Sequence, residues 1–117
     1  MMAGIQSALS GLQAFAAKIG NNAHNVANMN TEKFKKDSVV LSSQSPQGVR
    51  ATVQPAEAPG PFTAELSDQG YEMVEQSNVD LGEELPDLML NAHGYRANLK
   101  TLQTVDQMMQ SLLDTRA

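Results

Sequence analysis

Cysteine and tryptophan are both absent from this 117-residue chain, which has only three Phe and two Tyr. Without cysteine there is no disulfide, no thiolate nucleophile and no cysteine-based metal site. With so few aromatic side chains a large globular core is not expected, so Leu, Ile, Val, Ala and Met must supply most of the buried surface. The length suits one small domain.

Basic residues are also few, because eight Lys and Arg stand against thirteen Asp and Glu for a net charge of −5. No basic patch with interleaved aromatics is available for phosphates, so nucleic acid is not expected as a partner. No apolar run approaches the length of a membrane-spanning helix. No cleavable signal peptide is visible either, since Gln6, Ser7, Ser10 and Gln13 interrupt the stretch before the first positive charge at Lys18.

The last third of the chain predicts a long helix with one apolar stripe. From residue 81 onward, nine of ten positions spaced alternately by four and three are apolar or Tyr. These positions are Leu81, Leu85, Leu88, Ala92, Tyr95, Leu99, Leu102, Asp106, Met109 and Leu113. This is the a/d pattern of a coiled coil, and so narrow a stripe needs another helix to cover it.

The start of this helix carries conflicting signals. Asp80 is a candidate N-cap, and Glu83 would complete a capping box. Pro86 lacks the N–H that an interior helical position donates. The sequence therefore predicts either a bend between Gly82 and Pro86 or a regular helix that begins near Leu85.

The N-terminal region repeats the same spacing from Ile5 to Val26, and we expect a helix that ends there or at Ala27. All seven stripe positions are apolar: Ile5, Leu9, Leu12, Ala16, Ile19, Ala23 and Val26. The two stripes are expected to pack together, parallel or antiparallel. The pair would form either an ordinary two-helix core or one that completes its burial against neighbouring copies. The residues predicted to carry this packing are Ile5, Leu9, Leu12, Ile19, Val26, Leu85, Leu88, Tyr95, Leu99, Leu102 and Met109.

The middle of the chain has a different composition. In residues 38–42 and 49–54, apolar and polar side chains alternate as they do in β-strands, and residues 45–48 (Ser-Pro-Gln-Gly) form a turn between them. This pattern predicts a small β-hairpin. We expect residues 55–68 to be an irregular loop and residues 70–74 a short extended segment. The predicted fold is therefore mainly α: long terminal helices paired as a coiled coil, with one hairpin and a loop between them. The segments are 1–34 (helix and Asn-rich turn), 35–76 (hairpin and loop) and 77–117 (C-terminal helix).

A family resemblance enters at the end of the first helix. Residues 25–35 read Asn-Val-Ala-Asn-Met-Asn-Thr-Glu-Lys-Phe-Lys. This run resembles the N-terminal signature of bacterial flagellar rod and hook proteins, Asn-Ile-Ala-Asn-x-x-Thr-x-Gly-Phe-Lys. The matching residues are Asn25, Ala27, Asn28, Thr31 and Phe34. The family Gly is Lys33 here, and Gly suggests a positive φ. Lys33 therefore either strains the turn or the turn takes another form.

The C-terminal region resembles the same family. Residues 77–85 match the signature that opens its C-terminal helix, and residues 95–98 and 102–109 match the continuation. The motif residues are Ser77, Asn78, Val79, Asp80, Tyr95, Ala97 and Asn98. Pro86, where the family usually has an aliphatic residue, and Gly94, where it usually has Ala, depart from the pattern and loosen the helix.

The resemblance implies a structural, non-enzymatic subunit of the flagellar basal-body rod, most similar to the small proximal-rod members. It implies self-assembly with other rod proteins in the periplasm-spanning rod and export by the flagellar type III apparatus without a cleaved signal. No cofactor, metal or small-molecule substrate is expected. The alternative from another class is a soluble two-helix adaptor or chaperone-binding module in the cytoplasm.

Two pairs of side chains could form a chemical site, but a structural role explains each pair better. His24 and His93 are the two histidines, and neither has a carboxylate three or four residues further on to complete a metal site. Glu83 and Glu84 could act as an acid and a base, but a capped, solvated helix start explains them better.

Overall fold

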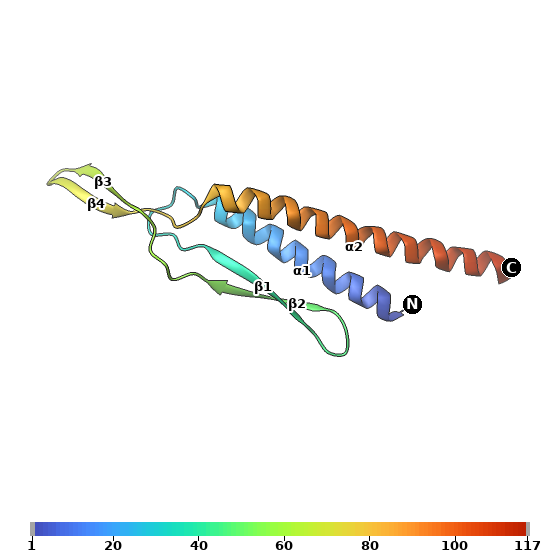
Figure 1. Ribbon diagram of the computed structural model, residues 1–117. Helices are drawn as coiled ribbons and strands as arrows, with labels where there is room; N and C mark the ends of the chain where they lie inside the picture. The colour runs from blue at the N-terminus through green and yellow to red at the C-terminus, as the bar shows by residue number, and fades with distance from the viewer. Residues whose placement is uncertain (1, 117) are drawn as a thin grey trace.

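The computed structural model describes residues 2–116; positions 1 and 117, the outer ends of the first and last predicted segments, lie outside the described residues. The chain forms two helices and two small antiparallel sheets (Figure 1). In order these are α1 (Met2–Ala27), β1 (Asp37–Ser43), β2 (Val49–Pro55), β3 (Phe62–Ser67), β4 (Gly70–Glu75) and α2 (Leu81–Arg116). The molecule measures 81 × 24 × 18 Å. Within residues 2–116, neither helix combines the length and hydropathy that a membrane crossing requires.

The two helices lie side by side and antiparallel, and α2 runs on past the start of α1 (Figure 1). Their contact depends on small residues. A Cβ on Gly11 would lie 2.6 Å from Asn98 Oδ1, and a Cβ on Gly94 would overlap the ring of Phe15. The glycines therefore allow a close approach that larger residues would prevent.

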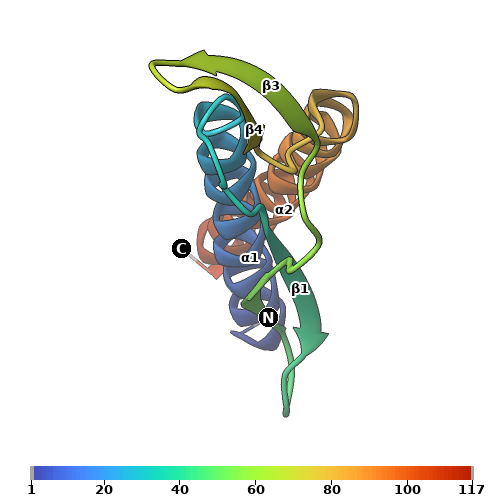
Figure 2. The ribbon, with the colours of Figure 1, turned by 90° about the vertical axis from the view of Figure 1, so that its left-hand side faces the viewer.

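The β1–β2 hairpin lies along α1, and the β3–β4 hairpin projects beyond the end of the helix pair (Figures 1 and 2). The hydroxyl of Ser10 accepts a hydrogen bond from the Val49 N–H at 3.1 Å, which ties β2 to α1. One side of α1 thus faces α2 and a second side faces a hairpin, and the rest has no partner within the described range 2–116.

The predicted coiled-coil pair with a single hairpin is wrong. The buried residues of α1 are small or polar, namely Ala8, Gly11, Ala14, Asn22 and Asn25. In α2 they are Glu84 and Asn91. On α1 most of these positions precede the predicted stripe by one residue, and one residue turns a helix by about 100°. The two helices therefore meet through a polar and small-residue face, while the predicted stripe of α1 is turned away.

The strands were predicted in part. The hairpin expected at residues 38–42 and 49–54 is confirmed as β1–β2, in which Val40 pairs with Thr52. The irregular loop expected at residues 55–68 is wrong, because its second half forms β3 and pairs with β4 across a two-residue turn. The three prolines of this segment interrupt strand pairing only up to Pro61. From Phe62 onward apolar and polar side chains alternate, and this run forms the strand.

The start of α2 confirms the N-cap expected at Asp80, whereas the bend expected between Gly82 and Pro86 stays a prediction. Asp80 is the N-cap, since its Oδ1 accepts a hydrogen bond from the Gly82 N–H at 2.9 Å. Glu83 does not complete a capping box in this arrangement and pairs with Lys36 Nζ at 3.3 Å. The helix begins at Leu81, so the later start near residue 85 is wrong. Pro86 is tolerated inside the helix although it donates no backbone hydrogen bond.

The close helix contact leads to a first prediction. Gly94→Ala should lower stability by about 1–2 kcal/mol, because the overlap with Phe15 outweighs the gain in helix propensity of about 1 kcal/mol. Gly20→Ala is the matched control, since a Cβ there meets no atom within 4 Å, and it should raise stability by about 1 kcal/mol. Urea unfolding followed by circular dichroism measures both. Equal stabilisation by the two substitutions would contradict the close contact.

Candidate functional site

A cluster of polar side chains joins the two helices, and we call it the polar core: buried Asn22, Asn25, Glu84 and Asn91 with half-buried Asp87. Asn25 is 0% exposed, Asn91 1% and Asn22 2%. The carboxylate of Glu84 accepts a hydrogen bond from the amide of Asn22 at 2.7 Å and another from Asn25 at 3.2 Å. Asp87 accepts from Asn22 at 2.9 Å and from Asn91 at 3.1 Å. Asn91 also donates to Asn22 Oδ1 at 2.7 Å, so the cluster is one continuous network.

The polar core extends to the start of β1. The amides of Asn21 and Asn25 donate to the Asp37 carbonyl at 2.7 and 2.9 Å. In return Asn25 Oδ1 accepts the Asp37 N–H at 3.1 Å. Asn25 therefore uses its amide group and its carbonyl group together, and holds the end of α1, the start of β1 and α2 in one arrangement.

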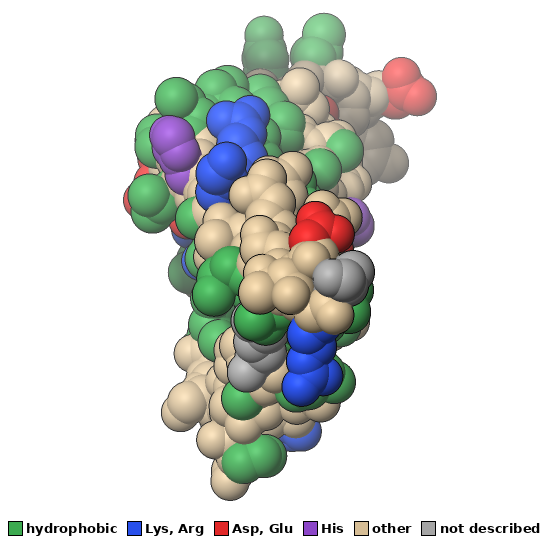
Figure 3. All heavy atoms as spheres, turned by 90° about the vertical axis from the view of Figure 1, so that its right-hand side faces the viewer, with side chains coloured by type: hydrophobic (Ala, Val, Ile, Leu, Met, Phe, Trp, Pro, Cys, Tyr) green, Lys and Arg blue, Asp and Glu red, His purple; other side chains and the backbone are tan. Residues whose placement is uncertain are grey.

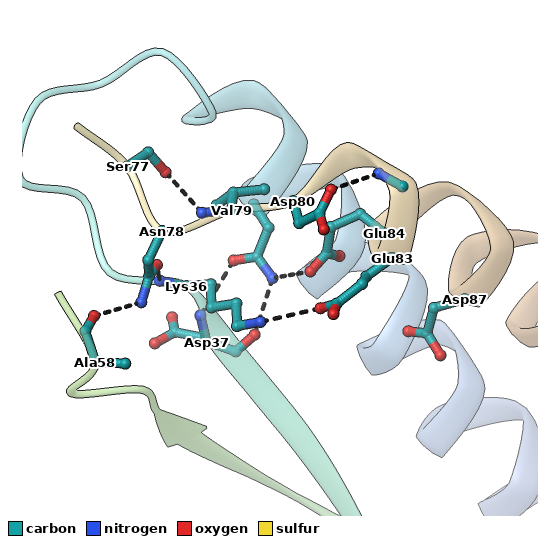
Figure 4. A network of polar contacts seen from close by, with 12 residues as sticks. Lys36, Asp37, Ala58, Ser77, Asn78, Val79, Asp80, Glu83, Glu84 and Asp87 are labelled. Atoms are coloured by element: carbon teal, nitrogen blue, oxygen red, sulfur yellow. Dashed lines mark hydrogen bonds and ion pairs between the residues drawn. The ribbon is translucent and has the colours of Figure 1, made fainter. Parts of the chain in front are cut away.

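The segment before α2 is fixed by a second set of polar contacts (Figure 4). Asn78 Oδ1 accepts the Lys36 N–H at 2.6 Å, and its amide donates to the Ala58 carbonyl at 2.9 Å. Buried Ser77 accepts the Val79 N–H at 3.1 Å through its hydroxyl. These contacts place the first turn of α2 beside β1, so that Glu84 reaches the asparagines of α1.

A polar cavity of about 220 Å³ lies beside this network. It is lined by Lys18, Asn21, Asn22, Asp37, Ser38, Val39, Glu84 and Asp87. Among residues 2–116, no buried side-chain nitrogen or oxygen lacks a hydrogen-bond partner. In the same range no group of three or more His, Cys, Asp or Glu side chains is placed to hold a metal ion. The arrangement thus satisfies its own polar atoms and orients three elements.

The helix pair also has an uncovered apolar face, on the side away from the β1–β2 hairpin. We call it the open face. At about 100° per residue, the α1 stripe lies on the flank of α1 that faces neither α2 nor the hairpin. Because the helices are antiparallel, the equivalent flank of α2 lies on the same side. The open face comprises Ile5, Leu9, Leu12, Ala16, Ile19, Ala23 and Val26 of α1 with Leu81, Leu85, Ala92 and Leu99 of α2.

The residues predicted for packing lie on this face or at its border. Leu9 is 48% exposed, Leu85 45% and Leu99 41%. The half-buried members are Ile5, Leu12, Ile19, Val26, Leu88, Tyr95 and Leu102. Met109 is 42% exposed and lies beyond the start of α1. The monomer leaves all of them incompletely covered, and their role in assembly stays a prediction.

The family-motif residues lie mostly where the chain turns out of α1 and back into α2. Thr31 donates from its hydroxyl to Asn28 Oδ1 at 3.1 Å. The ring of Phe34 meets that of His24 edge-on, with centroids 5.4 Å apart. The backbone of Lys33 has φ 60°, so the turn keeps the left-handed conformation that a glycine would favour. Ala27 and Ala97 are exposed, and Tyr95 and Asn98 are half-buried at the helix contact.

The polar core was missed from the sequence. The Asn-rich stretch of residues 21–30 reads as a helix exit because Asn favours caps and turns. Asn22, Asn25 and Asn91 nevertheless stand inside helices, and Glu84 lies in a helix start that suggested solvated charge. A usable signal was the spacing of Ala8, Gly11, Phe15, Asn22 and Asn25, which share one helical face.

Comparison with known proteins gives two findings, both for flagellar axial proteins. Residues 69–115 match the family model described as flagellar basal body rod FlgEFG protein C-terminal. The chain is also 40% identical over 50 residues to the flagellar hook protein FlgE of Borreliella burgdorferi (strain B31). That alignment covers 43% of this chain and 11% of the hook protein, so the chain spans a small part of that relative's length.

The polar core leads to a second prediction. Glu84→Ala should lower the free energy of unfolding by about 1–3 kcal/mol, because it removes one of the two acceptors from each of the buried amides of Asn22 and Asn25. Glu83→Ala is the matched control, since it removes a partly exposed ion pair with Lys36 and should cost about 0.5 kcal/mol or less. Urea titration measures both. Similar losses from the two variants would mean that the polar core does not hold the helices together.

The left-handed residue at the turn leads to a third prediction. Lys33→Gly should raise stability by about 1 kcal/mol, because a non-glycine residue is strained at φ 60°. Lys35→Gly serves as the control in a neighbouring position without positive φ, and it should destabilise through the loss of its ion pair with Glu75. The midpoint of thermal unfolding reports the difference. A lower midpoint for Lys33→Gly would show that this side chain contributes more than its backbone strain costs.

Proposed function

Residues 69–115 belong to the flagellar basal-body rod and hook family, and from this premise we propose that the chain is a structural, non-enzymatic subunit of the flagellar rod. The observation that carries the proposal is the open face. It follows both helices for most of the length of α1, and large apolar side chains such as Leu9, Leu85 and Leu99 are 41–48% exposed on it. An apolar face of this extent indicates a contact with other proteins.

Copies of the chain and other rod proteins are the proposed occupants of the open face. Helices from neighbouring subunits would cover it and remove the exposed leucines from water, each burial stabilising the assembly by about 1–2 kcal/mol. The polar core supports this assignment, because it holds both helices at one rotation and keeps their apolar flanks on the same side. The proposed location is the basal body, reached through the flagellar type III export apparatus.

The open face gives a fourth prediction. Leu99→Glu should weaken self-association at least about tenfold, since a carboxylate would be buried in an apolar contact. Ala97→Glu is the matched control, an exposed position on the opposite side of α2 from Leu99, and it should leave association unchanged. Sedimentation velocity over a range of concentrations measures association, and circular dichroism checks that both variants remain helical. Equal association of the two variants would exclude the open face as the assembly surface.

The cellular role needs a separate experiment. In the bacterium that encodes the chain, deletion of the gene should abolish motility, and a tagged copy should be recovered with purified basal bodies. In a strain without the type III export apparatus, the tagged copy should remain in the cytoplasm. If the deletion leaves motility intact and the tagged copy stays cytoplasmic in wild-type cells, the chain is an adaptor and the proposed rod function is wrong.

A further inference from the structure

The β3–β4 hairpin has one apolar face that nothing else among residues 2–116 covers. Residues paired across antiparallel strands point to the same side, and the pairs alternate between the two sides. Leu66 pairs with Tyr71 and Ala64 with Met73, so these four residues share a face with Phe62. Leu66 is 76% exposed, Tyr71 79%, Met73 67% and Phe62 56%. We call this surface the hairpin face.

This hairpin is held to the remaining structure at its base. The Lys33 N–H donates to the Glu75 carbonyl at 3.0 Å, and Lys35 pairs with the Glu75 carboxylate. The strands themselves project beyond the end of the helix pair (Figure 1). A two-stranded sheet is at best marginally stable in water, so the hairpin face needs a partner from outside the chain.

The charges around the hairpin restrict what that partner can be. No Lys or Arg occurs between Arg50 and Arg96. Glu65 and Glu72 face each other on the opposite side of the hairpin, and Asp68 lies in its turn. The strands of the hairpin and their turn thus carry acidic groups and no basic one, so two hairpins from different copies cannot form ion pairs with each other. The fitting partner is therefore an apolar surface that carries a basic residue.

The other end of the molecule offers such a surface. The pairing of Asn22 with Asp87 and of Asn25 with Glu84 sets the antiparallel register, so the last turns of α2 extend past the start of α1 (Figure 1). We call these turns the C-terminal overhang: Met108, Met109, Leu112, Leu113 and Arg116. Its four apolar side chains are 42–68% exposed. Figure 3 faces this end and shows hydrophobic, basic and acidic side chains at the surface.

We propose that the hairpin face of one copy covers the C-terminal overhang of a second copy, head to tail. The inference rests on the proposed self-assembly and names one of its contacts. The two surfaces lie at opposite ends of an 81 Å molecule, so this contact joins unlike patches and repeats along the long axis. A heterologous contact generates an open filament when it does not close into a ring. Arg116 also brings a basic group to the acidic hairpin.

The absence of native cysteine allows a direct test. Leu66→Cys and Leu113→Cys, each in the full chain, are mixed and treated with a short bismaleimide crosslinker, which tolerates looser geometry than a disulfide. Tags of different mass distinguish the two variants. The expected product is a heterodimer that joins the hairpin of one copy to the overhang of the other, several times more abundant than either homodimer. Glu72→Cys, on the opposite side of the same hairpin, should give little product with Leu113→Cys.

A second measurement keeps the test independent of the crosslinking geometry. Leu66→Asp combined with Tyr71→Asp should lower self-association at least tenfold, while helix content stays unchanged because both residues are exposed. Predominant Leu66→Cys homodimers, or undiminished association of the double variant, would overturn the head-to-tail contact. If association still depended on Leu99 in that case, the proposed rod function would stand while this contact failed.

Discussion

The buried carboxylate of Glu84 is the constraint on which the helix arrangement depends. A carboxylate removed from water is costly unless hydrogen-bond donors surround it, and here Asn22 and Asn25 supply them from the other helix. These bonds form at one register and one rotation of α1 against α2. Sliding or turning either helix would leave the charge and the amides unsatisfied, so the polar core selects one pairing out of several that an apolar contact would tolerate.

That selection determines which surfaces remain uncovered. With Gly11 and Gly94 at the close contact, the polar side of α1 faces α2 and the apolar flanks of both helices point the same way. The larger apolar side chains are therefore kept out of the contact between the two helices of one molecule. Among the described residues, the buried hydrophobic ones are Ala8 and Ala14. The larger apolar side chains can therefore still gain free energy by being buried in contacts between molecules.

The sequence indicated the helices, the first hairpin and the N-cap at Asp80, because each depends on neighbouring residues. The side of α1 predicted to contact α2 was wrong, because the prediction rested on apolar spacing. The actual contact is made by Gly11, Phe15 and Asn22, which do not form an apolar stripe. The same spacing located the residues that became the open face. The β3 strand was missed because prolines precede it and because its apolar face has no partner in the part of the chain that the structure describes.

The distribution of these surfaces follows from the lengths of the elements. Helix α2 has 36 residues and α1 has 26, so a register set near the start of α2 must leave the far end of α2 unpaired. The β3–β4 hairpin, placed just before α2, then lies at the opposite end of the molecule (Figure 1). The hydrogen bonds of the polar core therefore have two effects. They orient the open face, and by setting the helix register they place the hairpin and the C-terminal overhang at opposite ends of the molecule. A subunit with unlike apolar surfaces at its two ends is suited to joining copies along an axis rather than closing into a dimer.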